Sequence, residues 1–220
     1  MLQLLKDNHR YKETIFLGSI SLMCFSFSII RTLYSHTEMF LFLNWNLFLA
    51  FIPWVFTSIV VTRPRIQNSK IKMLLVLVTW LLFFPNAPYI LTDLFHLKSD
   101  STMPIWFDLI LILSFAWVGL FFGFLSLWDI ERITKNHIGV TFSKMLSAVL
   151  LFIAGFGIYI GRYLRWNSWD IVSSPFNLIS EVGSHIIFPF QHPTTWGLTL
   201  FMGAFLNIAY WSFRFIGNRK

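Results

Sequence analysis

Six apolar stretches, separated by short polar connections, predict six helices. Their length suggests the class of protein, because a helix needs about 20 apolar residues to cross the roughly 30 Å hydrocarbon core of a bilayer. Backbone groups in lipid must be hydrogen-bonded within the segment, and stretches of this length meet that requirement as helices and not as barrel strands. The expected transmembrane spans are 14–30, 39–61, 73–92, 109–128, 145–161 and 194–213.

A further helix is predicted in the connection between the last two stretches. Ser174 followed by Pro175 is typical of a helix start, where serine caps the end and proline occupies the first turn. Apolar residues then recur at near-helical spacing, so we expect an amphipathic helix over 175–188 at the outer membrane boundary. His185 and His192 are expected to be solvated residues of this boundary.

The composition agrees with a membrane protein. Hydrophobic residues make up 56% of the chain and charged residues only 12%, whereas a typical globular domain has about 25% charged residues. Such a chain has too little polar surface to coat a water-soluble globule. We therefore predict an all-α, polytopic membrane helix bundle in which residues 1–220 form a single six-helix transmembrane domain. The single cysteine, Cys24, excludes an intrachain disulfide.

The basic residues indicate the orientation in the membrane. Most of the 17 Lys and Arg residues fall at the two termini and in the connections 62–72 and 128–144. Cytoplasmic loops carry such an excess, so both termini are predicted to be cytoplasmic. Because these residues lie between apolar stretches and not on a face of a soluble domain, the net charge of +7 does not indicate nucleic-acid binding.

The third stretch departs from a simple span. Pro85 and Pro88 remove backbone donors inside it and should kink or open the helix. Polar residues that share one face of this helix form a stripe descending from the outer surface. Lipid cannot hydrogen-bond these groups, so the stripe should face neighbouring helices or a water-filled pocket. The polar stripe consists of Asn86, Tyr89, Asp93 and His96.

Polar groups at the outer ends of other spans would complete an extracytoplasmic polar pocket with the stripe. Two arginines within one turn, among tryptophans, suit bidentate binding of a phosphate or carboxylate at the headgroup level. Asn86 and Tyr89 of the stripe are expected to orient the ligand. The other expected ligand-binding residues are Asn44, Asn46, Arg162, Arg165 and Asp170.

Three residues, Asp93, His96 and Asp108, have alternative expected roles. Their carboxylate and imidazole groups are suited to acid or base catalysis on a bound substrate. The same three groups, if they hold a metal, suit zinc, manganese or iron. A structural role is the third alternative, in which Asp93 or Asp108 pairs with Arg162 or Arg165. The sequence leaves the three alternatives open, and whether the protein uses a cofactor is unknown from the sequence.

In four segments the chain resembles a bacterial family of multi-pass membrane proteins that is catalogued only as a domain of unknown function. The resemblance covers nearly the whole chain and rests on the combination of segments in this order. It implies a bacterial plasma-membrane location, and it supplies no activity, substrate or site residue. The four segments are NWN (44–46), FPNAPYILTDLFHL (84–97), WFD (106–108) and GRYLRWNSWD (161–170).

Three functions are compatible with these features. In the first, the outer pocket binds an anionic lipid headgroup or a lipid-linked envelope precursor, with or without catalysis on it. In the second, the protein is a non-catalytic subunit or chaperone of a cell-envelope complex. In the third, it is a small transporter, which the broken third helix favours and the confinement of the stripe to the outer half disfavours. We predict the first, with membrane lipid and other envelope membrane proteins as partners and no nucleic acid.

Overall fold

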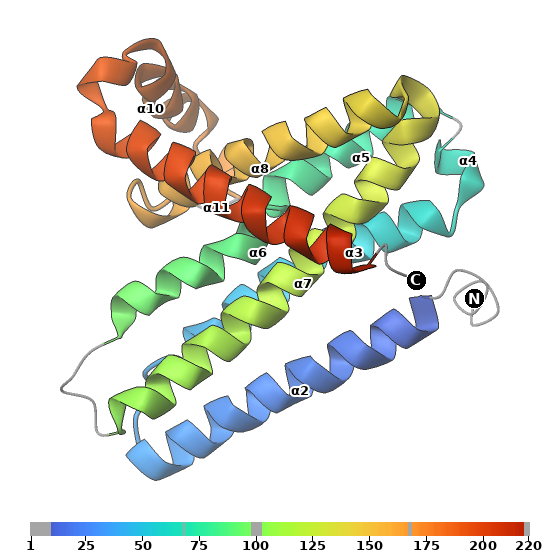
Figure 1. Cartoon of the computed structure of the whole chain (residues 1–220). Helices are drawn as coiled ribbons and strands as arrows, with labels where there is room; N and C mark the ends of the chain where they lie inside the picture. The colour runs from blue at the N-terminus through green and yellow to red at the C-terminus, as the bar shows by residue number, and fades with distance from the viewer. Residues whose placement is uncertain (1–9, 68, 98–102, 167–168, 218–220) are drawn as a thin grey trace. The chain divides into compact units, whose positions relative to one another are not determined.

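The computed structural model describes residues 10–67, 69–97, 103–166 and 169–217. All regular structure in these residues is helical, which confirms the all-α prediction (Figure 1). The helices are α2 (Arg10–Ser35), α3 (Phe42–Val61), α4 (Pro64–Gln67), α5 (Lys70–Phe83), α6 (Asn86–Tyr89), the 3₁₀ helix η1 (Ile90–His96), α7 (Ile105–Ile138), α8 (Val140–Arg162), α9 (Asp170–Ser173), α10 (Pro175–Ile187), the 3₁₀ helix η2 (Pro189–Gln191) and α11 (Pro193–Gly217).

Five helical segments of the described chain are long and apolar enough to cross a membrane. They coincide with the first five predicted spans, except that the second begins at Phe42 and not at residue 39, and they support a multi-pass membrane protein. The sixth predicted span, 194–213, lies in α11, a helix of 25 residues that is not among the five. The five segments are Arg10–Ser35, Phe42–Val61, Ile71–His96, Ile105–Ile138 and Val140–Arg162.

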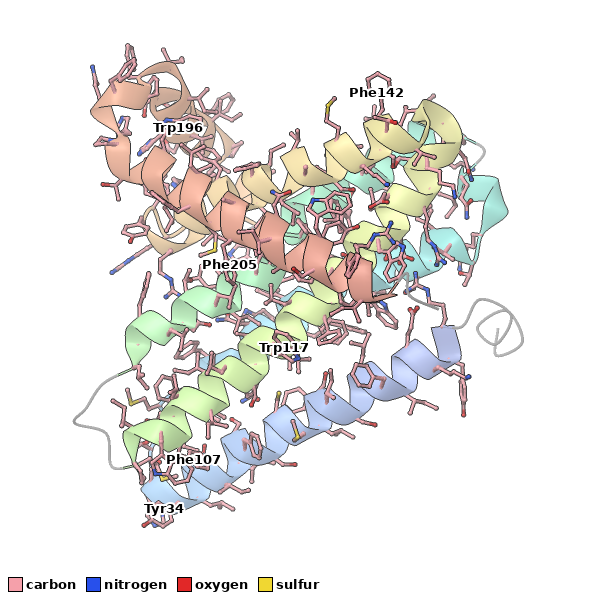
Figure 2. All side chains as sticks on the ribbon, in the orientation of Figure 1. Tyr34, Phe107, Trp117, Phe142, Trp196 and Phe205 are labelled. Atoms are coloured by element: carbon pink, nitrogen blue, oxygen red, sulfur yellow. The ribbon has the colours of Figure 1, made fainter. Side chains whose placement is uncertain are left out.

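Large apolar side chains project from the outer faces of these helices. Tyr34 on α2 is 70% exposed, and Trp117 on α7 and Phe142 on α8 are each 63% exposed (Figure 2). Soluble proteins rarely expose contiguous apolar surface on this scale. Hydrocarbon is the solvent that suits such faces, as the composition predicted.

The described helices belong to two compact units, Met1–Ile133 and Thr134–Lys220, and the boundary between them lies within α7. In the first unit, the core consists of apolar side chains from α2, α3, η1 and α7. Leu17, Leu47, Ile90 and Phe115 are central members of that core and are fully buried or nearly so.

The third span is divided at its prolines, as predicted. The α-helix α5 ends at Phe83, and the chain continues as α6 and then as the tighter helix η1. Pro85 and Pro88 disturb the regular backbone hydrogen bonds here. The Ala87 N–H donates to the Phe84 carbonyl, three residues earlier, and not to the Phe83 carbonyl, as it would in a regular α-helix. The Asn86 side-chain amide donates to the Phe83 carbonyl at 2.9 Å instead. Asn86 therefore supplies a donor that the broken backbone no longer provides.

Two glycines of α7 let this divided span approach closely within the first unit. A Cβ atom at Gly119 would lie 2.8 Å from the Ala87 carbonyl oxygen, and one at Gly123 would lie 3.0 Å from the Ala87 Cβ. Small residues four apart on one helix face are typical of close helix packing in membranes. The two glycines of α7 therefore make room for the backbone of the divided third span at Ala87.

In the second unit, α8 and α11 lie side by side and run antiparallel (Figure 1). Gly155 of α8 is in close contact with α11, because a Cβ there would lie 2.8 Å from the Thr199 carbonyl oxygen. Further along, the Asn207 side-chain amide donates to the Ala148 carbonyl at 3.3 Å. Small residues and an interhelical amide hydrogen bond are the contacts expected between helices in lipid.

The connection predicted at 128–144 is almost entirely helical. Helix α7 continues to Ile138 and α8 begins at Val140, so only Gly139, with φ 83°, separates them. The helix predicted over 175–188 is found as α10 with proline in its first turn, which confirms its existence. The Ser174 side chain, however, makes no capping hydrogen bond, so that detail of the prediction is wrong.

Candidate functional site

A buried ion pair joins α2 to α7 in the first unit. The Arg31 Nε donates to Asp108 Oδ1 at 2.8 Å, and Nη2 donates to Oδ2 at 3.4 Å. Arg31 is 1% exposed and Asp108 is fully buried. The sequence alone suggests Arg162 or Arg165 as a partner for Asp108, and the structure shows Arg31 of the first helix in that role.

The connection between α2 and α3 encloses the Arg31 guanidinium. Its Nη1 donates to Thr37 Oγ1 at 3.0 Å and to the Met39 carbonyl at 2.9 Å. The Phe40 ring covers the guanidinium at 4.7 Å, a cation–π distance. His36 and Phe40 have backbone φ values of 51° and 71°, which residues other than glycine rarely adopt. A conformation of this kind persists where the surroundings impose it, and here the enclosed charge does so.

A second cluster of charges lies at the other end of α2. Arg10 is 2% exposed, forms a buried ion pair with Asp129 of α7, and donates to Glu13 Oε2 at 2.8 Å. Its guanidinium also lies over the Trp54 ring of α3, 5.6 Å from the centroid. Burying a charge is expensive unless it is paired and hydrogen-bonded, and both arginines meet that condition.

The two ion pairs are equally spaced along both helices. Arg10 and Arg31 are 21 residues apart on α2, and Asp108 and Asp129 are 21 residues apart on antiparallel α7. At 1.5 Å per residue this interval is about 32 Å, close to the thickness of the hydrocarbon core. The pairs therefore join α2 to α7 at two levels that match the two membrane boundaries.

The expected asparagines of α3 are hydrogen-bonded to neighbouring helices. Asn46 donates to Asp93 Oδ2 at 2.9 Å, so these two predicted site residues do meet, and Asp93 is 1% exposed. Asn44 donates to Ser28 Oγ of α2 at 2.9 Å, while its side-chain oxygen is buried and has no hydrogen-bond partner among the residues that the structure describes. These contacts place Asn44 and Asn46 between helices, as polar groups in lipid require.

The remaining stripe residues lie in less buried positions. His96 is exposed at the end of η1 and makes an edge contact with the Phe42 ring, 5.4 Å between centroids. Tyr89 ends α6, and its carbonyl accepts from Thr92 Oγ1 at 2.7 Å. The described residues contain no group of three His, Cys, Asp or Glu side chains placed to hold a metal ion. Asp93, His96 and Asp108 thus do not form the three-ligand set that we considered.

The other predicted residues lie in the second unit, at the end of α8. Arg162 is the last residue of α8, and Arg165 is an exposed side chain with φ 59°. The turn is fixed by the Trp166 indole, which donates to Glu181 Oε2 of α10 at 2.6 Å. Asp170 begins α9 and accepts from Ser173 Oγ at 3.1 Å.

Aromatic rings and two histidines pack beside this turn. Tyr159 stacks on Tyr163 at 5.1 Å and contacts His185 at 5.6 Å, and His185 in turn stacks on His192 at 3.8 Å. The His185 carbonyl also accepts from the Trp196 indole of α11 at 3.0 Å. His185 is only 6% exposed, so the expectation of a solvated residue was wrong for it.

Sequence reasoning missed Arg10 and Arg31 as site residues, because we counted them only as orientation signals. A signal for both existed. Each arginine flanks the apolar part of the first helix, and the interval between them equals the interval between Asp108 and Asp129. Equal intervals of membrane length on two helices predict pairing at both boundaries of the bilayer if the helices are antiparallel.

Membrane-length helices, with charged and amide side chains paired between them, define a polytopic α-helical membrane protein. The chain belongs to the DUF1361 family of proteins of unknown function, whose family model matches residues 45–209. This match confirms the family resemblance inferred from the sequence. No curated protein and no solved structure matches the chain.

Proposed function

We propose that this membrane protein binds an anionic lipid headgroup, or the phosphate of a lipid-linked envelope precursor, at the end of α8. Arg162 and Arg165 are the binding residues. The observation that carries the proposal is Arg165, an exposed cation held at φ 59°. Glycine adopts that conformation easily and arginine does not, and such outliers cluster at functional sites.

The surroundings of the two arginines support a headgroup ligand. Tyr163 is 48% exposed and Trp169 is 47% exposed, and such rings are enriched at the level where headgroups meet hydrocarbon. The Trp166–Glu181 hydrogen bond holds the turn against α10, so the arginines are presented from a fixed backbone. A planar guanidinium can donate two parallel hydrogen bonds to two phosphate oxygens, a geometry that the ammonium group of lysine does not have.

For the topology, we propose six spans, with both termini in the cytoplasm and the end of α8 on the outer side of a bacterial plasma membrane. The excess of Lys and Arg at the termini and in two connections supports this orientation. The sixth span is supported by the glycine-mediated packing of α11 along α8. A 25-residue helix is about 37 Å long, which is enough to cross the hydrocarbon.

Cysteine labelling of intact bacteria distinguishes six spans from five. In a Cys24→Ser background, Gln191→Cys should react with a membrane-impermeant maleimide from outside, because Gln191 precedes α11 on the outer side. Ile216→Cys, near the other end of α11, should react only after the membrane is permeabilised. Equal labelling of both positions in intact cells would show that α11 does not cross.

Lipid titration tests the headgroup site. We expect Arg165→Ala in the full-length protein to weaken binding of phosphatidylglycerol about tenfold, since a hydrogen bond to a charged group corresponds to at least that factor. Arg165→Lys should recover part of the affinity, because the charge returns without the fork. Native mass spectrometry of the purified protein measures each affinity, with phosphatidylcholine as the zwitterionic comparison.

The control is Lys144→Ala, which removes an exposed cation from the opposite end of α8. It should leave the affinity of the site unchanged. If Lys144→Ala weakens binding as much as Arg165→Ala, the lipid responds to overall charge and the proposed site is wrong. Arg162→Ala should behave like Arg165→Ala if the two arginines share one headgroup.

A further inference from the structure

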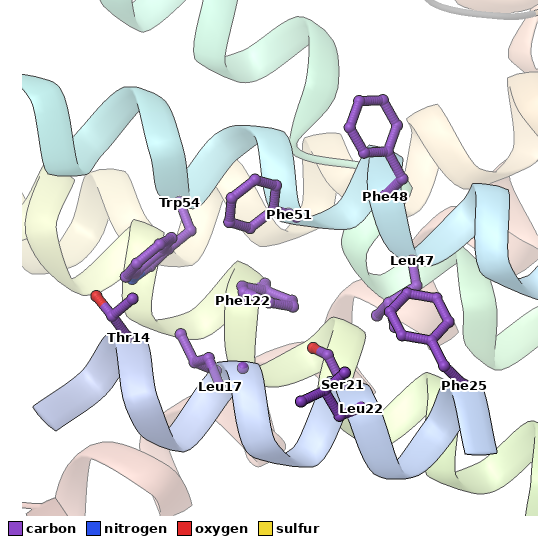
Figure 3. A pocket seen from close by; sticks show the side chains of 11 residues that line it. Thr14, Leu17, Ser21, Leu22, Phe25, Leu47, Phe48, Phe51, Trp54 and Phe122 are labelled. Atoms are coloured by element: carbon purple, nitrogen blue, oxygen red, sulfur yellow. The ribbon is translucent and has the colours of Figure 1, made fainter. Parts of the chain in front are cut away.

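In the first unit, an apolar groove with a volume of about 370 Å³ lies between α2, α3 and α7 (Figure 3). Its walls are Phe25 and other residues of α2, Phe48 and Phe51 of α3, and Phe122 of α7. We propose that this groove is a binding site for one hydrocarbon chain of an anionic membrane lipid. The site is separate from the arginines of α8 and does not depend on the function proposed for them.

The groove lies along the middle part of α2, between two ion pairs that hold its ends. The ion pairs Arg10–Asp129 and Arg31–Asp108 hold the two ends of α2 against α7. Between them, only 17% of the most apolar part of α2 is buried. The middle of the helix is therefore left with an apolar face that protein side chains do not fill.

Gly18 keeps the groove open. It lies in the middle of α2 and lines the groove, yet a Cβ atom there would meet nothing within 4 Å. Glycine weakens a helix relative to alanine, and it is usually retained where another backbone comes close, as at Gly119. Within the described part of the chain no group comes close at Gly18, so the space it leaves is available to a ligand.

The length of the groove fits a chain from one leaflet. Along α2 it extends from Thr14 to Phe25, which is about 16 Å at 1.5 Å per residue. Half of the hydrocarbon core is about 15 Å. The groove begins one helical turn inside Arg10 and ends near the middle of α2, so the chain would enter from the leaflet at the Arg10 end.

The charges at that end favour an anionic headgroup. The carboxylates of Asp129 and Glu131 are buried, and Asp129 is paired with Arg10. Among the described residues beside them, Glu13 is partly exposed and paired with Arg10, while Lys12 and Arg132 are exposed cations. A phosphate at this boundary would therefore meet positive charge, which attracts anionic lipids to a membrane protein.

Photo-crosslinking of the full-length protein in nanodiscs tests the proposal. The probe is phosphatidylglycerol with a diazirine near the end of one acyl chain, because Leu22 lies about 18 Å along α2 from Arg10. Leu22 lines the groove and is 67% exposed, while Met23, the next residue of the same helix and so at the same depth, lies outside it and is 47% exposed. A lipid that only surrounds the protein would label both equally. We expect much stronger labelling of Leu22.

Filling the groove with a larger side chain should abolish the difference in labelling between Leu22 and Met23. Gly18→Phe should lower labelling of Leu22 by about tenfold or more, because losing the burial of two methylene groups corresponds to that factor. Gly18→Ala is the matched control and should keep the labelling, since its Cβ meets open space. Ser21→Leu, another filling substitution, serves if Gly18→Phe does not fold.

Two results would overturn the proposal. One is equal labelling of Leu22 and Met23 in the unmodified protein, and the other is unchanged labelling of Leu22 in both filled variants. A phosphatidylcholine probe of the same chain structure should label more weakly, and equal labelling by both lipids would contradict the anionic headgroup.

Discussion

Replacing Arg31 with methionine is expected to lower the free energy of unfolding by about 3–5 kcal/mol, the range found when one partner of a buried ion pair is removed. Asp108 would remain fully buried without the cation that now donates to both of its oxygens. The Met39 carbonyl and Thr37 hydroxyl would also lose their guanidinium donor. Unfolding in mixed micelles with rising sodium dodecyl sulfate measures the change.

Two further variants separate the charge from the packing in this experiment. The double variant Arg31→Met with Asp108→Leu should recover most of the lost stability, because apolar replacements of a whole buried pair are often neutral. Arg63→Met, at an exposed position, should change stability by no more than about 0.5 kcal/mol. If the single and double variants are equally unstable, the buried charge at Asp108 is not the cause.

The features of the fold that were predictable are those with a local cause. Runs of apolar residues predicted the first five spans, because the length and hydropathy of a segment can be read from that segment without knowing the tertiary structure. Pro85 and Pro88 marked the break in the third span for the same reason, because a missing N–H disrupts a helix in any context. The helix α10 followed from Pro175 and an apolar period, although the capping detail at Ser174 did not hold.

The pairing of charges required tertiary information that hydropathy does not contain. One alternative from the sequence pairs Asp93 or Asp108 with Arg162 or Arg165, whereas Arg31, which pairs with Asp108 in the structure, lies 77 residues earlier in the chain. Helix ends were also misjudged. The predicted first and fourth spans end where charged residues begin, whereas the helices α2 and α7 continue beyond them. A charged residue that forms an ion pair, such as Arg31, can lie inside a helix.

The candidate site was predictable in part. The pairing of Asn46 with Asp93 agrees with the expectation that the stripe faces other helices, and polar groups in lipid must do so. The left-handed backbone at Arg165 and the burial of His185 were not visible in the sequence. Both depend on how the chain turns after α8 and returns as α10, and no local residue preference specifies that path.

Gly155→Leu is the second substitution with a large expected effect, and it acts through helix packing. A Cβ atom at this position would lie 2.8 Å from the Thr199 carbonyl oxygen and 3.1 Å from the Gly203 nitrogen. Both are backbone atoms, so no side-chain rotation can relieve the overlap and α8 must move away from α11. We expect a loss of about 3 kcal/mol, the upper part of the usual range for overpacking.

The same titration with sodium dodecyl sulfate measures this loss, and Gly197→Leu on α11 is its matched control. A Cβ at Gly197 would meet nothing within 4 Å, so the leucine should be neutral or should stabilise the helix by up to about 1 kcal/mol. Gly155→Ala should fall between the two, since its single methyl already overlaps the Thr199 carbonyl.

Because Arg162 ends α8 and Arg165 follows it three residues later, we also expect Gly155→Leu to weaken phosphatidylglycerol binding. Equal stability of Gly155→Leu and Gly197→Leu would mean that close contact between α8 and α11 does not hold this unit together, and the support it gives to a sixth span would be lost.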